Sequence, residues 1–200
     1  MNKIAKFAAA AALTIGFMTT AAMAGNALYD GDEVVITPAA ISADQNVDAS
    51  ATFPAIKRGN IIAYNSAKKR GSIIVDTNSN NLYFVLGFGK AIQYRVATAK
   101  PGFEWAGTHT VASKTQWPDW RPPVEMRARR PELPAYMAGG PKNPLGARAM
   151  YLGGSIYRIH GTNEPSSIGK HASSGCIRML NADVIELFQL VKVGTEVTVL

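Results

Sequence analysis

The sequence contains a single cysteine, Cys176, and only three histidines, His109, His160 and His171, among 200 residues. A lone thiol cannot form a disulfide within the chain, so Cys176 serves either packing or reactivity. The histidines are dispersed and form no close pair with one another or with the cysteine, which argues against a zinc site. We therefore expect neither a metal nor another cofactor.

Long apolar runs are also missing, except for one near the N-terminus. Lys3 and Lys6 precede an apolar stretch at residues 7–22, and Ala22-Met23-Ala24 follows the small-x-small pattern of a cleavage site. This arrangement predicts a signal peptide over residues 1–24, with an uncleaved signal anchor as the alternative. No later stretch approaches the roughly 20 apolar residues of a membrane span. We expect an exported protein of the periplasm or cell envelope, with no transmembrane segment after cleavage.

Basic residues are lacking from one part of the chain. Residues 25–56 hold five acidic side chains and no lysine or arginine, whereas residues 57–200 hold nineteen basic and nine acidic side chains. Residues 25–59 show no sustained hydrophobic periodicity, so we interpret them as a flexible acidic leader. Residues 60–200 are long enough for one domain. In an exported protein, the basic excess favours an anionic wall polymer or membrane surface over nucleic acid as the partner.

The hydrophobic pattern of residues 60–200 is mostly β. A β-branched run at 72–76 and an apolar run at 82–86 flank the turn residues 78–81, which predicts a hairpin. Further strands are expected at residues 92–97, 108–112, 155–160 and 195–200.

One helix is expected after the cysteine. Apolar residues recur at helical spacing on one face, namely Val184, Leu187, Phe188 and Val191. The segment Asn181-Ala182-Asp183 is expected to cap the start of this helix, and Gly194 to end it. The fold class is therefore mainly β with one or two helices.

A long segment at residues 114–148 carries seven prolines together with Trp117, Trp120 and Tyr136. Loops of this length are uncommon in compact domains and often act as lids or binding loops. We expect these three aromatic residues to belong to a lid, with a structureless insertion as the alternative.

The segment from His160 to Arg178 has the composition of a thiol active site. His160 ends a predicted strand and is the expected general base, while Cys176 is the expected nucleophile. The main-chain N–H groups around Ser174, Gly175 and Cys176 are expected to stabilise an oxyanion. Arg178 and the following helix are expected to help lower the pKa of the thiol.

A third group must orient the imidazole of His160. No Asp or Asn is adjacent to it, so the carbonyl of Gly161 is the candidate. His171 is interpreted as a solvated or rim residue, and His109 as structural or at the edge of the cleft. The alternative for Cys176 is an inert buried thiol.

These residues closely resemble the signature of the L,D-transpeptidase catalytic domain (YkuD-type) family. The resemblance covers roughly residues 60–200 and rests on several short motifs. The Glu104-Trp105-Ala106 stretch lacks a proline often found there, and Ser174 replaces a histidine that many members have before the Gly-Cys pair. The matching motifs are Gly107-Thr108-His109-Thr110-Val111, Asn143-Pro144-Leu145-Gly146, His160-Gly161-Thr162, Ser166-Ser167-Ile168-Gly169, and Ser174-Gly175-Cys176-Ile177-Arg178-Met179 with Asn181.

The resemblance implies a β-sandwich with a lid loop and a helix after the catalytic cysteine. It also implies that Cys176 attacks the diamino-acid carbonyl of a peptidoglycan tetrapeptide stem and releases D-alanine. The acyl group would then pass to an amine of another stem, giving a 3-3 crosslink, or to a protein such as an outer-membrane protein. Transfer to water would make the protein a carboxypeptidase. Arg178 would bind a substrate carboxylate or brace the cysteine loop.

Three alternatives remain at this point. Wall-hydrolase cysteine peptidases place the cysteine before the histidine, and sortase-like enzymes separate the two more widely. The third alternative is a wall-binding module that has kept the fold and lost the chemistry.

Overall fold

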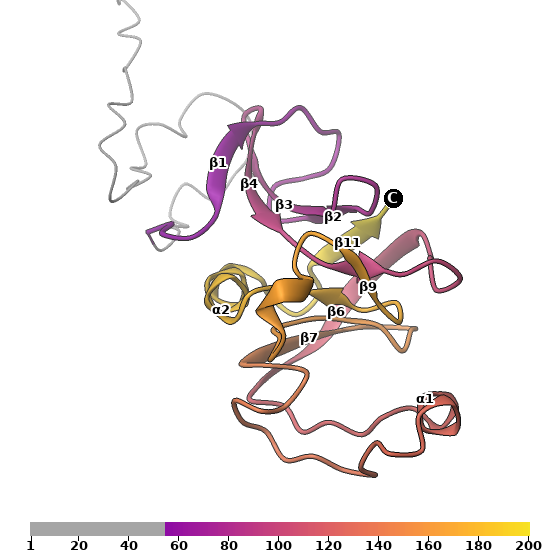
Figure 1. The fold of residues 1–200 in the computed structure, drawn as a ribbon. Coiled ribbons are helices and arrows are strands. Elements are labelled where there is room, and N and C mark those ends of the chain that lie inside the picture. The colour runs from indigo at the N-terminus through magenta and orange to yellow at the C-terminus, as the bar shows by residue number, and fades with distance from the viewer. Residues whose placement is uncertain (1–54) are drawn as a thin grey trace, which may run out of the picture.

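The computed structural model describes residues 55–200, so the predicted signal peptide and most of the predicted leader lie outside the described residues. The described part is mainly β with two α-helices, as expected (Figure 1). Neither helix of this part is long and apolar enough to cross a membrane. The strands are β1 (Asn60–Ala63), β2 (Ile73–Asp76), β3 (Asn81–Gly87), β4 (Lys90–Arg95), β5 (Thr98–Ala99), β6 (Gly107–Gln116), β7 (Arg148–Leu152), β8 (Arg158–His160), β9 (His171–Ser173), β10 (Ile177–Arg178) and β11 (Glu196–Val199); the helices are α1 (Val124–Arg129) and α2 (Asn181–Leu190).

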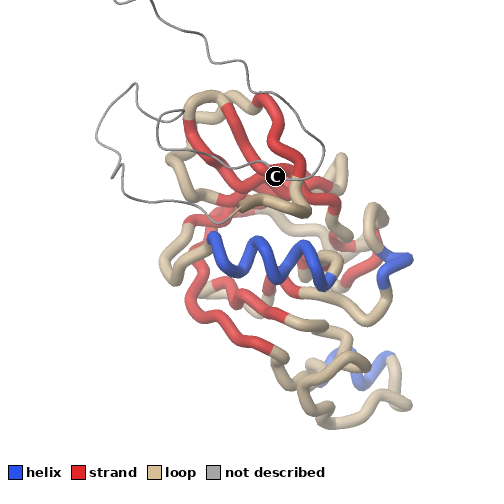
Figure 2. The backbone as a smooth tube through the Cα atoms, turned by 90° about the vertical axis from the view of Figure 1, so that its left-hand side faces the viewer, coloured by secondary structure: helices blue, strands red, loops and turns tan. Residues whose placement is uncertain are grey.

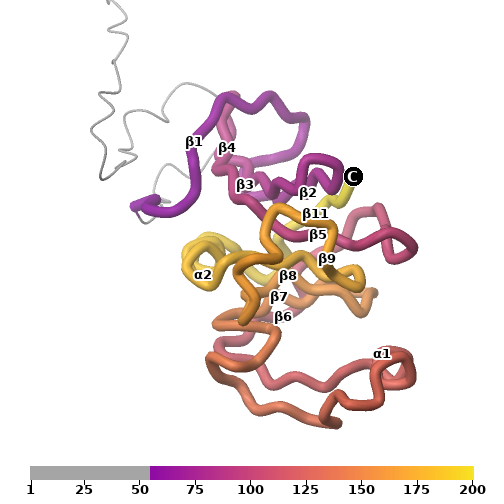
Figure 3. Tube along the Cα trace, in the orientation of Figure 1, coloured from indigo at the N-terminus to yellow at the C-terminus, as the bar shows by residue number. Residues whose placement is uncertain are grey.

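Nine of these strands form one sheet, in the order β1-β4-β3-β2-β11-β6-β7-β8-β10. The long strand β6 connects its two parts, because its first half pairs with β11 and its second half with β7. The register shifts between Val111 and Ser113, and such irregularities bend a strand where it passes from one layer to another. Strands β5 and β9 form a separate parallel pair, labelled in Figure 3.

Helix α2 lies between the upper strands β1–β4 and the lower strands β6 and β7 (Figures 1 and 2). Its residues Val184, Leu187 and Leu190 are buried, which confirms the amphipathic pattern of the sequence. Side chains from both parts of the sheet and from α2 form a single hydrophobic core, which includes Ile73, Leu82, Phe84, Ile92, Met150, Ile159, Met179 and Val197.

The predicted caps of α2 are wrong. Asn181 is the first residue of the helix, and no side chain caps its N-terminus. The helix ends at Leu190, four residues before Gly194, since Val191 is already extended. The C-terminal carbonyls are satisfied instead by Lys114 of β6, whose Nζ donates to the carbonyls of Phe188, at 2.6 Å, and Val191. This cation lies at the negative end of the helix dipole.

The last residues of the predicted leader belong to the folded domain. Ile56 is buried in the core, and the main-chain N–H groups of residues 57–59 donate to the Glu186 carboxylate at 2.6–3.0 Å. The hydroxyl of Tyr94 donates to the same carboxylate at 2.8 Å. The buried Glu186 therefore fixes the point at which the chain enters the domain, and the domain begins at about residue 56 rather than at 60.

The loop between β6 and β7 is ordered by one buried side chain. The Nδ2 group of Asn143 donates to the carbonyls of Pro118, Met137 and Ala138 at 3.0–3.2 Å, and its Oδ1 accepts from the Leu145 N–H at 2.8 Å. These bonds close the base of the loop. Within the loop, the short helix α1 was not expected from the sequence, and it has no buried residue.

We expect Glu186→Gln to lower the free energy of unfolding by about 2–4 kcal/mol, because the amide would turn N–H groups toward donors of the main chain. Urea denaturation measures this loss. Glu196→Gln is the matched control: Glu196 pairs with Lys68 at the surface, where such a pair contributes about 0–1 kcal/mol. Equal losses in the two variants would contradict the assigned role of Glu186.

Candidate active site

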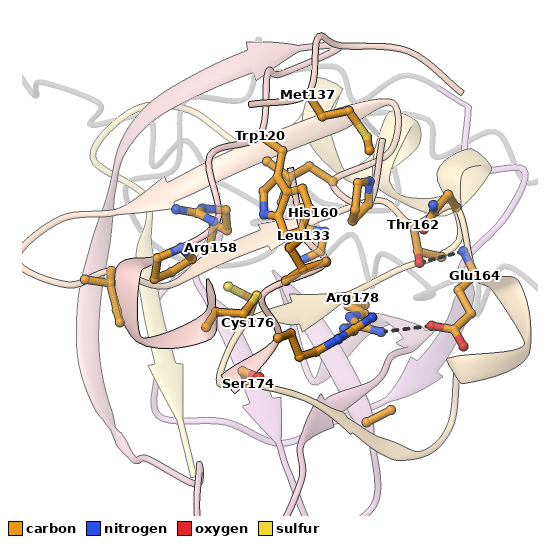
Figure 4. A pocket seen from close by; sticks show the side chains of 18 of the residues that line it. Trp120, Leu133, Met137, Arg158, His160, Thr162, Glu164, Ser174, Cys176 and Arg178 are labelled. Carbon is orange, nitrogen blue, oxygen red and sulfur yellow. Dashed lines mark hydrogen bonds and ion pairs between the residues drawn. The ribbon is translucent and has the colours of Figure 1, made fainter. Parts of the chain in front are cut away.

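Cys176 and His160 line the same pocket, which has a volume of about 510 Å³ (Figure 4). His160 comes from the end of β8, and Cys176 from the turn that precedes β10. These two strands are parallel neighbours, with Arg178 opposite His160, so the sheet brings the two segments side by side. The loop between β6 and β7 supplies the opposite wall. Lining residues from that loop are Trp120, Pro123, Met126, Arg129, Arg130, Leu133, Pro134, Met137, Lys142, Pro144 and Leu145.

His160 is held by a main-chain acceptor. Its Nδ1 lies 2.6 Å from the carbonyl oxygen of Gly161. A carbonyl can only accept, so Nδ1 carries the proton and Nε2 of the neutral ring is left as the acceptor. The ring is almost fully buried, with 4% of the residue exposed. The imidazole is thus fixed in the tautomer that a general base requires.

Burial disfavours the charged forms of both His160 and Cys176. It lowers the pKa of His160 to about 3; the Gly161 and Leu145 carbonyls raise this pKa, while Arg178 and Arg158 lower it further. Burial also raises the pKa of the Cys176 thiol, and Arg158 and Arg178 offset this increase only in part. Arg178 lowers the pKa of the thiol, as expected, but burial has the larger effect and the pKa is raised overall. At neutral pH the site holds a thiol and a neutral imidazole.

The Gly161 carbonyl is positioned by α2. The amide oxygen of Asn181 accepts from the N–H groups of Ala147, at 2.9 Å, and Thr162, at 3.1 Å. A Cβ atom at Gly161 or at Gly146 would lie 2.2 Å from this oxygen, so both positions require glycine. The side chain that was expected to cap the helix instead joins it to the two loops beside His160.

The turn before Cys176 is also fixed by a hydrogen bond. The N–H of Gly175 donates to the hydroxyl of Ser173 at 3.1 Å, and Gly175 has a φ of +108°, which favours glycine. The N–H of Gly175, one of the expected oxyanion donors, is therefore already hydrogen-bonded within the turn. Ser174 lines the pocket.

Arg178 lies in the pocket and also braces a neighbouring loop. Its Nη1 is 3.4 Å from Oε2 of Glu164, which is largely exposed. Its main-chain groups bond with those of Ala97 at 2.8 and 2.9 Å, which attach β10 to the segment between β4 and β5. The two roles left open by the sequence are therefore compatible.

Of the three expected lid aromatics, the structure places only Trp120 in the pocket lining. Trp120 is buried and forms a two-bond bridge with Met137. Trp117 and Tyr136 are about half exposed and do not line the pocket, and the ring of Tyr136 lies 4.6 Å from the guanidinium of Arg121. Trp117 and Tyr136 therefore lie on the loop between β6 and β7 without facing the pocket, and their part in a lid stays a prediction.

The other two histidines lie outside the pocket lining. His171 is exposed, and its Nδ1 lies 3.0 Å from the Thr98 hydroxyl. His109 lies on β6, with its Nδ1 at 2.9 Å from the Gly153 carbonyl. Among residues 55–200, no group of three or more His, Cys, Asp or Glu side chains could hold a metal ion.

The segment that builds this pocket matches a known family. Residues 70–199 match the L,D-transpeptidase catalytic domain, YkuD. The chain belongs to this family. The family resemblance that the sequence motifs indicated is therefore confirmed, and the match covers most of the described residues.

Several proteins named as L,D-transpeptidases are similar to this chain. YqjB of Bacillus subtilis is 38% identical over 134 residues, which cover 64% of this chain and 69% of that protein. ErfK/SrfK of Escherichia coli is 36% identical over 140 residues, which cover 66% of this chain and 44% of that protein. A protein of Fuscovulum blasticum is 43% identical over 94 residues, covering 47% and 49%. The chain spans less than half the length of the last two.

Solved L,D-transpeptidase structures share the fold of this domain. The enzyme from Mycobacterium smegmatis has a TM-score of 0.53 at 16% identity, covering 66% of this chain and 58% of that one. The catalytic domain from E. faecium has a TM-score of 0.52 at 20% identity, covering 68% and 100%. A structure described as the Ldtfm-avibactam carbamoyl enzyme has a TM-score of 0.53 at 20% identity, covering 66% and 49%.

Sequence reasoning missed several residues of the pocket, and Arg158 is the one nearest in the chain to His160. Arg158 lines the pocket beside Cys176 and His160, and its charge acts on both. Both the charge and the main chain of Arg158 lower the pKa of the Cys176 thiol, against the larger effect of burial. The alternation of residues 155–160 places Arg158 and His160 on the same side of the strand, and this pattern could have identified Arg158 as a residue of the site.

We expect Asn181→Ala to lower the free energy of unfolding by about 2–3 kcal/mol, because two main-chain N–H groups of the domain lose their acceptor. It should also slow acylation of Cys176, since the Gly161 carbonyl is no longer held. Asn181→Asp retains an oxygen acceptor and should lose less of both. Urea denaturation measures the first effect and single-turnover acylation the second. An Asn181→Ala variant with the stability and acylation rate of the wild type would contradict the role assigned to the Asn181 amide oxygen.

The raised pKa of Cys176 predicts the pH dependence of its alkylation. Iodoacetamide reacts with the thiolate, whose fraction rises about tenfold per pH unit below the pKa. We expect the rate to keep rising from pH 6 to pH 9 without a plateau. A plateau that begins near pH 6 would indicate a preformed thiolate–imidazolium pair and would contradict the neutral resting state.

Proposed function

We propose that this protein is a peptidoglycan L,D-transpeptidase in which Cys176 is the nucleophile and His160 the general base. The observation that carries the proposal is the shared pocket within the segment that matches the family (Figure 4). His160 ends β8, Cys176 lies in the turn just before the neighbouring parallel strand β10, and both side chains line one cavity. The proposal includes export to the periplasm or cell envelope, where this substrate occurs.

In the first step the Cys176 sulfur attacks the carbonyl carbon of the diamino acid in a tetrapeptide stem. Because both groups start neutral, the thiol proton passes to Nε2 of His160 as the S–C bond forms. The Gly161 carbonyl stabilises the imidazolium through Nδ1–H. The N–H groups of Cys176 and Ser174 stabilise the oxyanion.

The tetrahedral intermediate then breaks its C–N bond. His160 returns the proton to the departing amine, D-alanine leaves, and a thioester on Cys176 remains. In the second step an amine attacks the thioester, its proton passes through His160, and the thiol is restored. An amine of another stem gives a 3-3 crosslink, an amine of an outer-membrane protein gives attachment to the wall, and water gives a carboxypeptidase reaction.

The charge of the pocket supports an anionic substrate such as a stem peptide with carboxylate groups. Glu164 is the one acidic residue of the lining, and it is already paired with Arg178. Basic side chains are in excess there: Lys100, Arg129, Arg130, Lys142, Arg158 and Arg178. Since guanidinium groups bind carboxylates with two parallel hydrogen bonds, we assign Arg178 a part in binding the stem as well as in bracing the Glu164 loop.

The test is covalent labelling with a carbapenem, followed by mass spectrometry of the intact protein. We expect one adduct on the wild type, formed when Cys176 opens the β-lactam ring. Because Cys176 is the only cysteine in the sequence, an adduct through sulfur has a single location. Cys176→Ala should form no adduct and should keep the circular dichroism spectrum of the wild type.

Two results would overturn the proposal. One is the absence of any adduct on the folded wild type, and the other is an adduct of equal yield on Cys176→Ala.

A further inference from the structure

One side chain outside the His160–Cys176 pair holds the peptide bond that precedes the nucleophile. The indole Nε1 of Trp105 donates to the carbonyl oxygen of Gly175 at 2.6 Å. Trp105 lies just before β6, 70 residues away in the chain, and does not line the pocket. Trp105 therefore contacts the active-site turn from outside the pocket.

The indole itself is held between two other rings. It stacks on Tyr157, with 4.3 Å between ring centroids and an interplanar angle of 5°. His109 meets it edge-on at 5.4 Å and 77°, and the Nδ1 of His109 is hydrogen-bonded to the Gly153 carbonyl at 2.9 Å. Trp105 and Tyr157 also pack against the hydrophobic core. The indole N–H is thus a donor of fixed direction.

Gly175 has no freedom to move away from this donor. A Cβ atom at this position would lie 2.3 Å from the Tyr157 ring, so the glycine backbone sits directly against that ring. On its other side, the Gly175 N–H is bonded to the Ser173 hydroxyl. Both polar main-chain groups of Gly175 are therefore engaged.

The carbonyl of Gly175 and the N–H of Cys176 belong to the same peptide unit. Because a trans peptide is planar, its C=O and N–H point in opposite directions, and fixing one fixes the other. A hydrogen bond to the carbonyl also polarises the unit and makes its N–H a stronger donor. The Trp105 bond therefore sets both the direction and the strength of the Cys176 N–H, which the proposed function uses as an oxyanion donor.

We infer that Trp105 is a positioning residue of the oxyanion site, acting through the Gly175–Cys176 peptide. This inference rests on the proposed function, since it concerns the stabilisation of a tetrahedral intermediate formed on Cys176. It also gives the Trp105–Tyr157–His109 ring cluster a function. Tyr157 and His109 hold the indole in place, and the indole N–H holds the Gly175–Cys176 peptide.

Two reagents separate this role from a general role in folding. Opening of a carbapenem ring by Cys176 passes through an oxyanion, whereas alkylation by iodoacetamide is a displacement at a saturated carbon and forms none. Removing an oxyanion donor outright slows acyl transfer by about 10²–10³-fold. Loosening one donor should have a smaller effect, on the order of tenfold.

The experiment compares wild type with Trp105→Phe, which keeps a ring against Tyr157 and lacks the N–H. A second variant carries the benzothienyl analogue of tryptophan at position 105, in which sulfur replaces the N–H and the bicyclic shape is kept. For each protein we measure the rate of carbapenem acylation by stopped flow, the rate of iodoacetamide alkylation at the same pH, and the melting temperature.

We expect acylation to slow by about tenfold in both variants while alkylation stays within twofold of wild type. Unchanged acylation in the analogue-bearing protein would overturn the inference, and so would an equal slowing of both reactions, which is the result of a merely structural role. Failure of the wild type to acylate would reject the proposed function, and the inference with it, whereas normal acylation of wild type and variants alike rejects the inference alone.

Discussion

The amide oxygen of Asn181 is the contact on which the geometry of the site depends. It receives the N–H groups of Ala147 and Thr162, and so joins α2, the start of β7 and the loop after β8 at one point. Gly146 and Gly161 are pressed against this oxygen so closely that neither tolerates a Cβ atom. The Gly161 carbonyl that binds His160 is therefore held by packing and hydrogen bonding that begin in the helix, not in the strand that carries the histidine.

A second constraint is electrostatic. Burial of the imidazole and the thiol keeps both neutral, although two arginines lie near them. Such a site reacts only when a proton moves within it, because separated charges are costly in a medium of low polarisability. Both arginines line the pocket, and both lower the pKa of the thiol against the larger effect of burial.

The fold was predictable where the signal is local. The hairpin of β2 and β3, the strand β6, the final strand and the amphipathic face of α2 all follow from short-range hydrophobic periodicity. Strand β7, the short strands β5, β9 and β10, and the helix α1 were not predicted, because each is only two to six residues long and owes its existence to its neighbours. The caps of α2 failed for a related reason: Asn181 has stronger partners in distant loops, and Lys114 reaches the helix end from another strand.

The sequence by itself determined the class of the fold, the pairing of a histidine motif with a cysteine motif, and membership of the L,D-transpeptidase family. It could do so because the residues around His160 and Cys176 form continuous local motifs. Only the tertiary structure decided that the thiol rests neutral, that Trp120 faces the pocket while Trp117 and Tyr136 do not, that Arg158 shares the pocket with Cys176, and that Trp105 bonds to the Gly175 carbonyl. These properties depend on burial and on contacts between segments up to 70 residues apart, and neither is encoded in any single stretch of the chain.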